Sequence, residues 1–263
     1  VHAREHVRRV KDLCAQAEVE QKILAVDPDT KVSPATWDAA VGSAGTAIQA
    51  CRRVASGALS RAFVATRPPG HHATPGRAMG FCLFNNVAVA ARWLQAEGEA
   101  ESILIVDWDV HHGNGTQDAF YQDPSVFFLS VHQAPHYPGT GAAGETGSGE
   151  GEGTTLNVPL PGGVSVDVYR EHFSRSLEKA LTGFRPDFVL VSSGFDSMAG
   201  DPLGSFPLEP ADLFGMTREV VARAEEHCHG RVVALLEGGY VPERVGAGTV
   251  AVMRALANLE APA

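Results

Sequence analysis

Residues 103–116 (ILIVDWDVHHGNGT) constrain the fold of this chain more than any other stretch. The apolar, β-branched run Ile103–Val106 predicts a strand that is buried on both faces, and the later Gly-Asn-Gly sequence predicts that a loop begins there. If the strand continues, Asp107, Asp109 and His111 point to one side, because strand side chains alternate. Taken singly, such residues more often cap a helix or sit in a core. Two carboxylates and an imidazole together are costly to bury unless they bind something, and a divalent metal is the simplest partner.

The rest of the chain alternates between apolar runs typical of buried strands and segments with helical spacing. This pattern predicts one α/β domain over residues 1–263, with a mostly parallel sheet covered by helices on both faces. The predicted strands are 61–66, 103–106, 125–132, 154–160, 188–193 and 231–236. The predicted helices are 1–24, 35–56, 87–96, 168–181, a segment within 210–229, and 245–259.

The composition limits the classes of function. With 44% hydrophobic and 20% charged residues, the 263-residue chain is typical of a globular protein in water, and no apolar run is long enough for a membrane span. The net charge of −10 argues against a nucleic-acid backbone as a direct partner and is compatible with a cationic substrate. The four cysteines form no C-x-x-C pair, which favours a reducing, cytoplasmic compartment. Homo-oligomerisation stays open.

Polar residues follow four different predicted strands. They are His71-His72, the segment 107–111, Asp196 and Tyr240. Because open parallel sheets bind ligands at the carboxyl ends of their strands, we expect these residues to meet at one edge.

The residue types at this edge suggest metal-assisted hydrolysis of an amide or ester. A catalytic zinc keeps three protein ligands and an open position, and Asp109, His111 and Asp196 can supply the three. His71 or His72 can act as a general base near neutral pH.

Three further residues are available to support the histidines and the substrate. Asp107 and Asn114 can bond the far ring nitrogens of the histidines. Tyr240 can donate its hydroxyl to a developing oxyanion.

Six motifs resemble the zinc-dependent histone deacetylase and acetylpolyamine amidohydrolase superfamily, especially its class II-like bacterial amidohydrolases. They are RPPGHHA (67–73), GFCLFNN (80–86), DWDVHHGNGT (107–116), YPGTG (137–141), SSGFDSMAGDPLG (192–204) and LEGGY (236–240). The resemblance implies a three-layer αβα arrangement, the arginase/deacetylase fold. It also implies removal of acetyl or other acyl groups from lysine side chains of proteins or peptides.

The resemblance assigns roles to the residues at the sheet edge. It implies Asp109, His111 and Asp196 as ligands of one Zn²⁺. It implies His72 as the general base and then acid, with His71 as its electrostatic partner and Tyr240 as the donor to the acyl carbonyl. Asp107 would orient His71, and Asn114 would orient His72, with Asn in place of Asp as in class II-like members.

The resemblance also implies a narrow substrate tunnel. Phe81 and Tyr137 match the aromatic pair that flanks an acyl-lysine stem, although Tyr stands where Phe is common. Considered without this motif context, both would be read as core residues. The carbonyl of Gly80 would accept the substrate amide, and Asp29 would bond the substrate backbone at the rim. Leu203 stands where polyamine-selective relatives carry a Glu, which favours acyl-lysine over acylated polyamines.

A structural K⁺ site is implied as well, mostly through backbone carbonyls. Its residues would be Asp107, Asp109, His111, Ser130 and Val131.

The family has a further N-terminal segment, with a strand of the sheet, before the position of Val1. The resemblance therefore implies a chain truncated at that end and a sheet that lacks this strand. His132 and His136 are expected to be loop or core residues, and Glu237 to have a structural role.

Three alternatives stay open. One is an acetylpolyamine amidohydrolase or another small acyl-amine deacylase. Another is an arginase-like binuclear manganese hydrolase, which would need an Asp where this chain has Gly194. The third is a binding module that retains the pocket without turnover.

Overall fold

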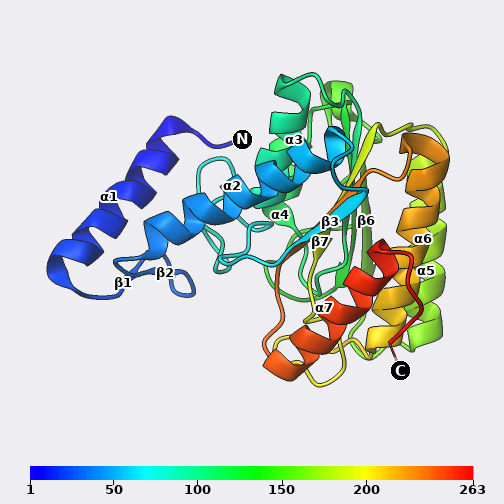
Figure 1. The fold of residues 1–263 in the computed structure, drawn as a ribbon. Coiled ribbons are helices and arrows are strands. Elements are labelled where there is room, and N and C mark those ends of the chain that lie inside the picture. Colours follow the sequence, from blue (N-terminus) through cyan, green and yellow to red (C-terminus); the bar gives the residue numbers. More distant parts are fainter. Residues whose placement is uncertain (263) are drawn as a thin grey trace.

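Six strands form one parallel sheet in the computed structural model, which describes residues 1–262 (Figure 1). Every neighbouring pair of strands in this sheet is parallel, as predicted. In spatial order the strands are β3 (Arg61–Val64), β8 (Val232–Leu236), β7 (Phe188–Ser193), β4 (Ile103–Asp107), β5 (Val126–Gln133) and β6 (Thr155–Leu160).

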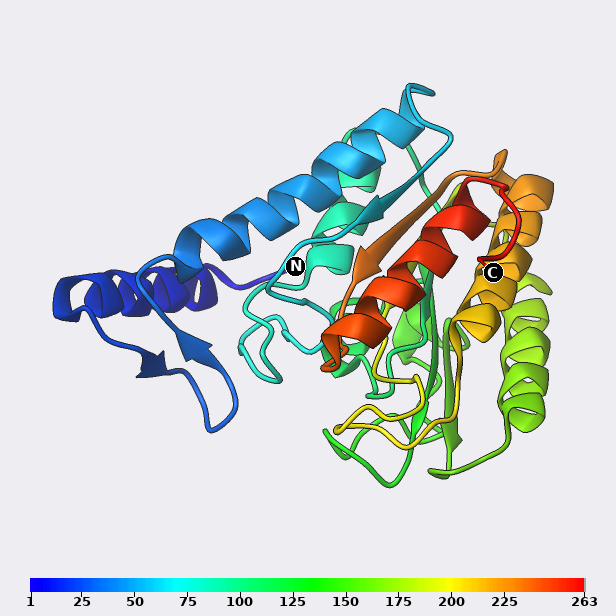
Figure 2. The same cartoon turned by 60° about the horizontal axis from the view of Figure 1, so that its bottom comes forward.

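Helices cover both faces of the sheet, so the fold is a three-layer αβα arrangement. Figures 1 and 2 show α2 (Thr36–Ala55) and α3 (Asn86–Ala96) on one side. On the other side lie α5 (Val166–Leu181), α6 (Pro210–Cys228) and α7 (Pro242–Leu256).

The side chains of the central strand β4 explain why helices cover both faces of the sheet. Ile103 and Ile105 pack in the core beside α2 and α3, whereas Leu104 and Val106 pack in the core beside α5, α6 and α7. Strand side chains alternate between faces, so a strand that is apolar at every position needs a helix layer on each side.

A smaller third core joins the N-terminal arm to the rest of the chain. The arm consists of α1 (Arg4–Glu20) and the antiparallel pair β1 (Leu24–Ala25) and β2 (Lys31–Val32), and it lies apart from the sheet in Figure 1. Its apolar residues pack against α2 and against Leu83 and Phe84 of the loop before α3.

Most predicted bounds differ from the structure by one to three residues, as for α7, which was predicted at 245–259. Two differences are larger. The first helix ends at Glu20 instead of residue 24, because the chain turns there into the short β1–β2 pair. The Gly-Asn-Gly sequence does not begin a loop: Gly113 is the N-cap of α4 (Asn114–Phe120). Within residues 1–262, no helix is both long and apolar enough to cross a membrane.

The strand order creates one favoured place for a site. β4 is flanked by β7 on one side and β5 on the other, so the chain reverses its direction of winding beside β4. In such sheets the loops at the carboxyl ends separate at this switch point and leave a crevice. The segments that follow β3, β4, β5, β7 and β8 all open to this edge.

Candidate metal centre

Asp109 and His111 lie in a tight turn after β4, not in the strand itself. β4 ends at Asp107, so the strand does not continue and its alternation does not set the directions of Asp109 and His111. Asp107 Oδ1 accepts a hydrogen bond from the Asp109 N–H at 3.0 Å, and Asp109 Oδ1 accepts one from the His111 N–H at 2.9 Å. Asp side chains often bond the backbone two residues on, and two such bonds in succession form this turn.

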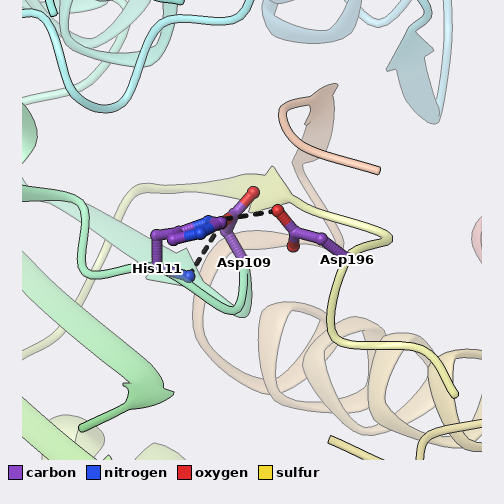
Figure 3. A group of neighbouring side chains, drawn as sticks. All are labelled: Asp109, His111 and Asp196. Carbon is purple, nitrogen blue, oxygen red and sulfur yellow. Dashed lines mark hydrogen bonds and ion pairs between the residues drawn. The ribbon is translucent and has the colours of Figure 1, made fainter. Parts of the chain in front are cut away.

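Asp109, His111 and Asp196 meet in one buried group (Figure 3). Each offers one ligand atom, and these atoms lie within 4.8 Å of one another. His111 Nδ1 is 3.0 Å from Asp109 Oδ1 and 3.2 Å from Asp196 Oδ2. A tetrahedral ion with bonds of about 2.1 Å separates its ligand atoms by about 3.4 Å, so these spacings fit one shared metal ion.

The carboxyl group of Asp196 gives a second indication of a metal-binding site. Its Oδ1 accepts a hydrogen bond from the Val110 N–H at 2.9 Å. Apart from the nearby His111 ring, no donor in residues 1–262 reaches its buried Oδ2. Burial and the neighbouring Asp109 carboxylate raise the pKa of Asp196 to about 6. Buried polar atoms normally have a partner, and a divalent cation would supply one here.

Two glycines allow the backbone to approach these ligands closely. A Cβ at Gly238 would lie 2.0 Å from Asp196 Oδ2, and one at Gly194 would lie 2.3 Å from Asp109 Oδ2. Gly194 is the position at which a binuclear site would need a carboxylate. Because not even a Cβ fits there, the geometry supports a single metal ion over the arginase-like alternative.

His71 and His72 follow β3 and lie beside the metal-ligand group, with ring centroids 4.0 Å apart. His71 Nδ1 is 3.0 Å from Asp107 Oδ2, and His72 Nδ1 is 2.8 Å from Asn114 Oδ1. An amide oxygen only accepts, so Nδ1 of His72 carries the proton and Nε2 is left as a base.

The two histidines have pKa values shifted in opposite directions. Burial lowers the pKa of His71, but the carboxylates of Asp109 and Asp107 outweigh it and bring the pKa well above its ordinary value. Burial and the charge on His71 hold the pKa of His72 well below its ordinary value. A cationic imidazole next to a neutral one is the pattern expected of an electrostatic partner and a base.

A cavity of about 330 Å³ leads to this group from the surface. The sequence-predicted residues His72, Gly80, Phe81, His111, Tyr137, Leu203, Asp29 and Tyr240 line it, together with His136, Pro202, Gly204 and Ser205. The sequence thus names eight of its twelve lining residues.

Aromatic rings form the cavity walls. The Phe81 ring lies 5.8 Å from that of Tyr240, and the Tyr137 ring lies 5.1 Å from that of His72, both edge to face. Phe81 has a φ of +66°, and its N–H donates to Thr30 Oγ1 at 3.1 Å. A bulky residue in this strained backbone region persists only when its surroundings hold it, and such strain gathers at functional sites. The wall therefore depends on the N-terminal arm, which supplies Thr30.

Gly80 lies close to His72, and Tyr240 lies close to the candidate metal ligands Asp109 and Asp196. A Cβ at Gly80 would lie 2.4 Å from His72 Cδ2, so only glycine lets the backbone pass there. The Tyr240 N–H donates to Asp201 Oδ2 at 2.8 Å. Burial and the carboxylates of Asp109 and Asp196 raise the pKa of Tyr240, so its hydroxyl stays protonated and can donate.

The remaining predicted residues lie at the cavity mouth and along the sheet. Asp29 is exposed at the mouth, and Leu203 is 38% exposed on the cavity wall. Asp107 is the register partner of Ser130 across β4 and β5, and Val131 follows Ser130. The proposed K⁺ residues are thus neighbours, and potassium there stays a prediction.

His136 is a loop residue, as predicted, but its place in the cavity wall was not predicted. His136 lines the cavity and its ring stacks on that of His111, with centroids 4.9 Å apart and planes 14° apart. Its Nε2 donates to the Leu203 carbonyl at 2.8 Å, which joins two loops of the wall. The feature of the sequence that points to this position is that His136 directly precedes Tyr137, a predicted residue of the substrate tunnel. His132, by contrast, is buried in the core as expected.

Comparison with known proteins agrees with this architecture. The histone deacetylase domain model matches residues 1–256. A probable deacetylase of Archaeoglobus fulgidus is 43% identical over 244 residues, which cover 92% of this chain and 66% of that protein. Histone deacetylase 14, chloroplastic, of Arabidopsis thaliana is 47% identical over 194 residues, 74% of this chain and 46% of that protein.

The fold matches a solved structure of the same kind. The crystal structure of the HDA15 HD domain superposes with a TM-score of 0.92 at 41% identity, covering 98% of this chain and 71% of that one. The chain spans less than two thirds of the length of these curated relatives. Sequence and fold agree over nearly all of its length, and the chain belongs to the histone deacetylase family.

Proposed function

We propose that this chain is a zinc-dependent deacetylase that removes acetyl or other acyl groups from lysine side chains of proteins or peptides. One observation carries the proposal: a group of two carboxylates and one imidazole, spaced for a single ion, lies at the end of a cavity with His72 and Tyr240 beside it. Family membership supports the same activity.

Asp109, His111 and Asp196 would hold the zinc ion. Bound there, zinc would polarise the acyl carbonyl and make water more acidic. The donor set fits because Asp oxygen and His nitrogen are ordinary zinc ligands and the group leaves room for a fourth, non-protein position.

The other residues of the site bind the substrate and move protons. Phe81 and Tyr137 would enclose the aliphatic stem of the acyl-lysine, and the Gly80 carbonyl would accept its amide N–H. His72 takes a proton from the attacking water at Nε2 and returns it to the leaving amine. Tyr240 donates its hydroxyl to the carbonyl oxygen as negative charge develops there.

His71 and Asn114 support the base His72. Asn114 holds its ring in one tautomer through the 2.8 Å contact at Nδ1. The cationic His71, paired with Asp107, keeps His72 neutral before the reaction, because a second positive charge beside it is unfavourable.

Substrate class, ions and location complete the proposal. Leu203 places an apolar side chain on the cavity wall, which favours an acyl-lysine peptide over a polyamine with a further ammonium group. We also propose that a structural K⁺ binds between the ends of β4 and β5. The whole chain, residues 1–263, would form a single catalytic domain.

The four cysteines are free and buried, which is consistent with a cytoplasmic location.

The direct test is a substrate panel assayed with and without added zinc and chelator. A fluorogenic acetyl-lysine peptide is expected to be hydrolysed by the zinc-loaded chain, and turnover should stop with chelator and return with zinc. Faster turnover of acetylated polyamines would favour the small-amine alternative. Metal-loaded chain that turns over neither substrate would contradict the proposal and favour a binding module.

Metal removal is expected to destabilise the chain, and more strongly as the pH rises from 7 to 9. Burial lowers the pKa of His111, but its bonds to Asp109 and Asp196 raise it to about 10, above the ordinary 6.5. In the metal-free chain this contributes stability that is complete below pH 6.5 and is lost as the pH rises through about 10. With zinc bound, His111 is a neutral ligand and this loss is absent.

The difference in melting temperature between zinc-loaded and metal-free chain should therefore widen over this range. A change of two pH units corresponds to at most about 3 kcal/mol, or on the order of 5 °C for a chain of this size. Differential scanning calorimetry of both forms in matched buffers measures it. Groups away from the metal centre contribute equally to both forms and cancel in the difference, so a constant or narrowing gap would contradict His111 as a ligand.

A further inference from the structure

We infer that Glu237 is a positioning residue that fixes the loop carrying the base His72 relative to the loop carrying Tyr240. The inference rests on the roles proposed above for these two residues. Glu237 is completely buried, yet it is not one of the three metal-ligand candidates and does not line the cavity. A buried carboxyl group without a chemical role needs another explanation, because its desolvation is costly.

The carboxyl group of Glu237 bonds two separate segments of the site. Its Oε2 accepts hydrogen bonds from the backbone N–H groups of Gly70 at 2.7 Å and His71 at 3.1 Å. Its Oε1 accepts one from Ser192 Oγ at 3.1 Å. One side chain therefore connects three segments: the loop after β3 that carries His71 and His72, the end of β7, and the residue after β8 where Glu237 itself lies.

The backbone of Glu237 is held as firmly as its side chain. Arg67 Nη1 donates to the Glu237 carbonyl at 2.5 Å, and the Glu237 N–H donates to the Ser193 carbonyl at 3.2 Å. The next residue, Gly238, donates its N–H to Asp109 Oδ2 at 2.8 Å. Tyr240 follows two residues later, so its loop starts from two residues, Glu237 and Gly238, whose backbone groups are hydrogen-bonded.

These bonds form a closed connection between the two loops. Arg67 and His71 lie at opposite ends of the Pro-Pro-Gly turn, and both bond to Glu237, one at its carbonyl and one at its carboxylate. A shift of the turn would therefore break contacts with the segment that leads to Tyr240. Because displacement of reacting groups by about 1 Å can cost on the order of 100-fold in rate, this connection matters for turnover.

The chemistry of the side chain allows a sharp comparison of variants. Glu237→Ala leaves two buried backbone N–H groups and the Ser192 hydroxyl without an acceptor. Glu237→Gln keeps an oxygen for the two N–H groups, and its amide can donate to Ser192 Oγ once that hydroxyl turns away. If Glu237 acts by positioning the two loops, the Glu237→Gln variant should keep most of this effect and the Glu237→Ala variant should lose it.

The experiment compares Glu237→Ala, Glu237→Gln and the control Leu94→Ala, which removes a buried side chain of α3 outside the site. All are assayed as zinc-loaded full chains at a temperature where circular dichroism shows each to be folded. Glu237→Ala should lower kcat by about 10- to 100-fold with little change in KM. Glu237→Gln should recover most of kcat. An equal loss for Gln and Ala, or for Leu94→Ala, would overturn the inference.

A second readout does not depend on activity. Hydrogen exchange of the Gly70 and His71 amides, measured by mass spectrometry on metal-free and zinc-loaded chain, should be much faster in Glu237→Ala than in Glu237→Gln or Leu94→Ala. Unchanged exchange would overturn the inference. If the unaltered chain proves to have no deacetylase activity, the proposed function fails, but this measurement still tests the connection.

If the Glu237→Ala variant does not fold, the Arg67→Met variant provides a second test of the same connection. Arg67 is on the surface, so its replacement should leave the chain folded. Loss of its bond to the Glu237 carbonyl should speed amide exchange over residues 237–240 and lower kcat several-fold. If the Arg67→Met variant has the same amide exchange over residues 237–240 and the same kcat as the unaltered chain, the inference is overturned.

Discussion

Asp109→Ala is expected to remove both metal binding and turnover. Asp109 is fully buried, contacts His111 Nδ1 at 3.0 Å, and helps to form the turn that places that histidine. The substitution therefore removes one ligand and misplaces another. We expect less than one tenth of an equivalent of zinc after dialysis and a loss of at least about 10³-fold in kcat/KM.

The control for this substitution is Asp118→Ala, the same change at an exposed position of α4. It should bind one zinc ion per chain, measured by plasma mass spectrometry, and retain full activity. One tightly held zinc per chain in Asp109→Ala would mean that the ion sits elsewhere, and the proposed centre would be wrong.

His72→Ala is expected to abolish turnover and leave zinc in place. His72 lies outside the group of three ligands, and Asn114 fixes its ring so that Nε2 faces away from that contact. Removing a general base typically costs about 10²- to 10⁴-fold in rate. Steady-state kinetics and metal analysis of the same preparation separate the two effects.

His172→Ala provides a matched control, because His172 is exposed on α5 and belongs neither to the metal-ligand group nor to the cavity lining. It should be active and zinc-loaded. Loss of zinc from His72→Ala would show that this histidine is a ligand, whereas unchanged kcat would transfer the role of base to another group, with His71 the first to examine.

The fold could be predicted from sequence because its signal is local. Four-residue apolar runs such as 103–106 need cover on both faces, and helical spacing between them predicts parallel crossovers. Ends of elements were harder to predict. The strand β4 stops at Asp107 because carboxylate-to-backbone bonds replace the sheet ladder, and a hydrophobicity pattern carries no signal for that.

The site was predictable where a residue type implies its chemistry. Residue type and strand position predict Asp109, His111 and Asp196 as ligands, and the structure brings them together. The sequence does not reveal His136 and Glu237 as parts of the site, because their importance arises from contacts between distant segments of the chain. His136 bonds residue 203, and Glu237 bonds residues 70 and 71, and no pattern in one sequence reveals these pairings.

The close approach at Gly194 has a consequence for protein engineering. Since the Cβ position there falls 2.3 Å from Asp109 Oδ2, introducing an acidic side chain would push Asp109 out of the proposed metal centre instead of adding a ligand to it. Conversion into a two-manganese enzyme would require rebuilding the main chain around β4 and β7. Backbone spacing, as well as the side chains, therefore limits the room for a second ion at the proposed centre.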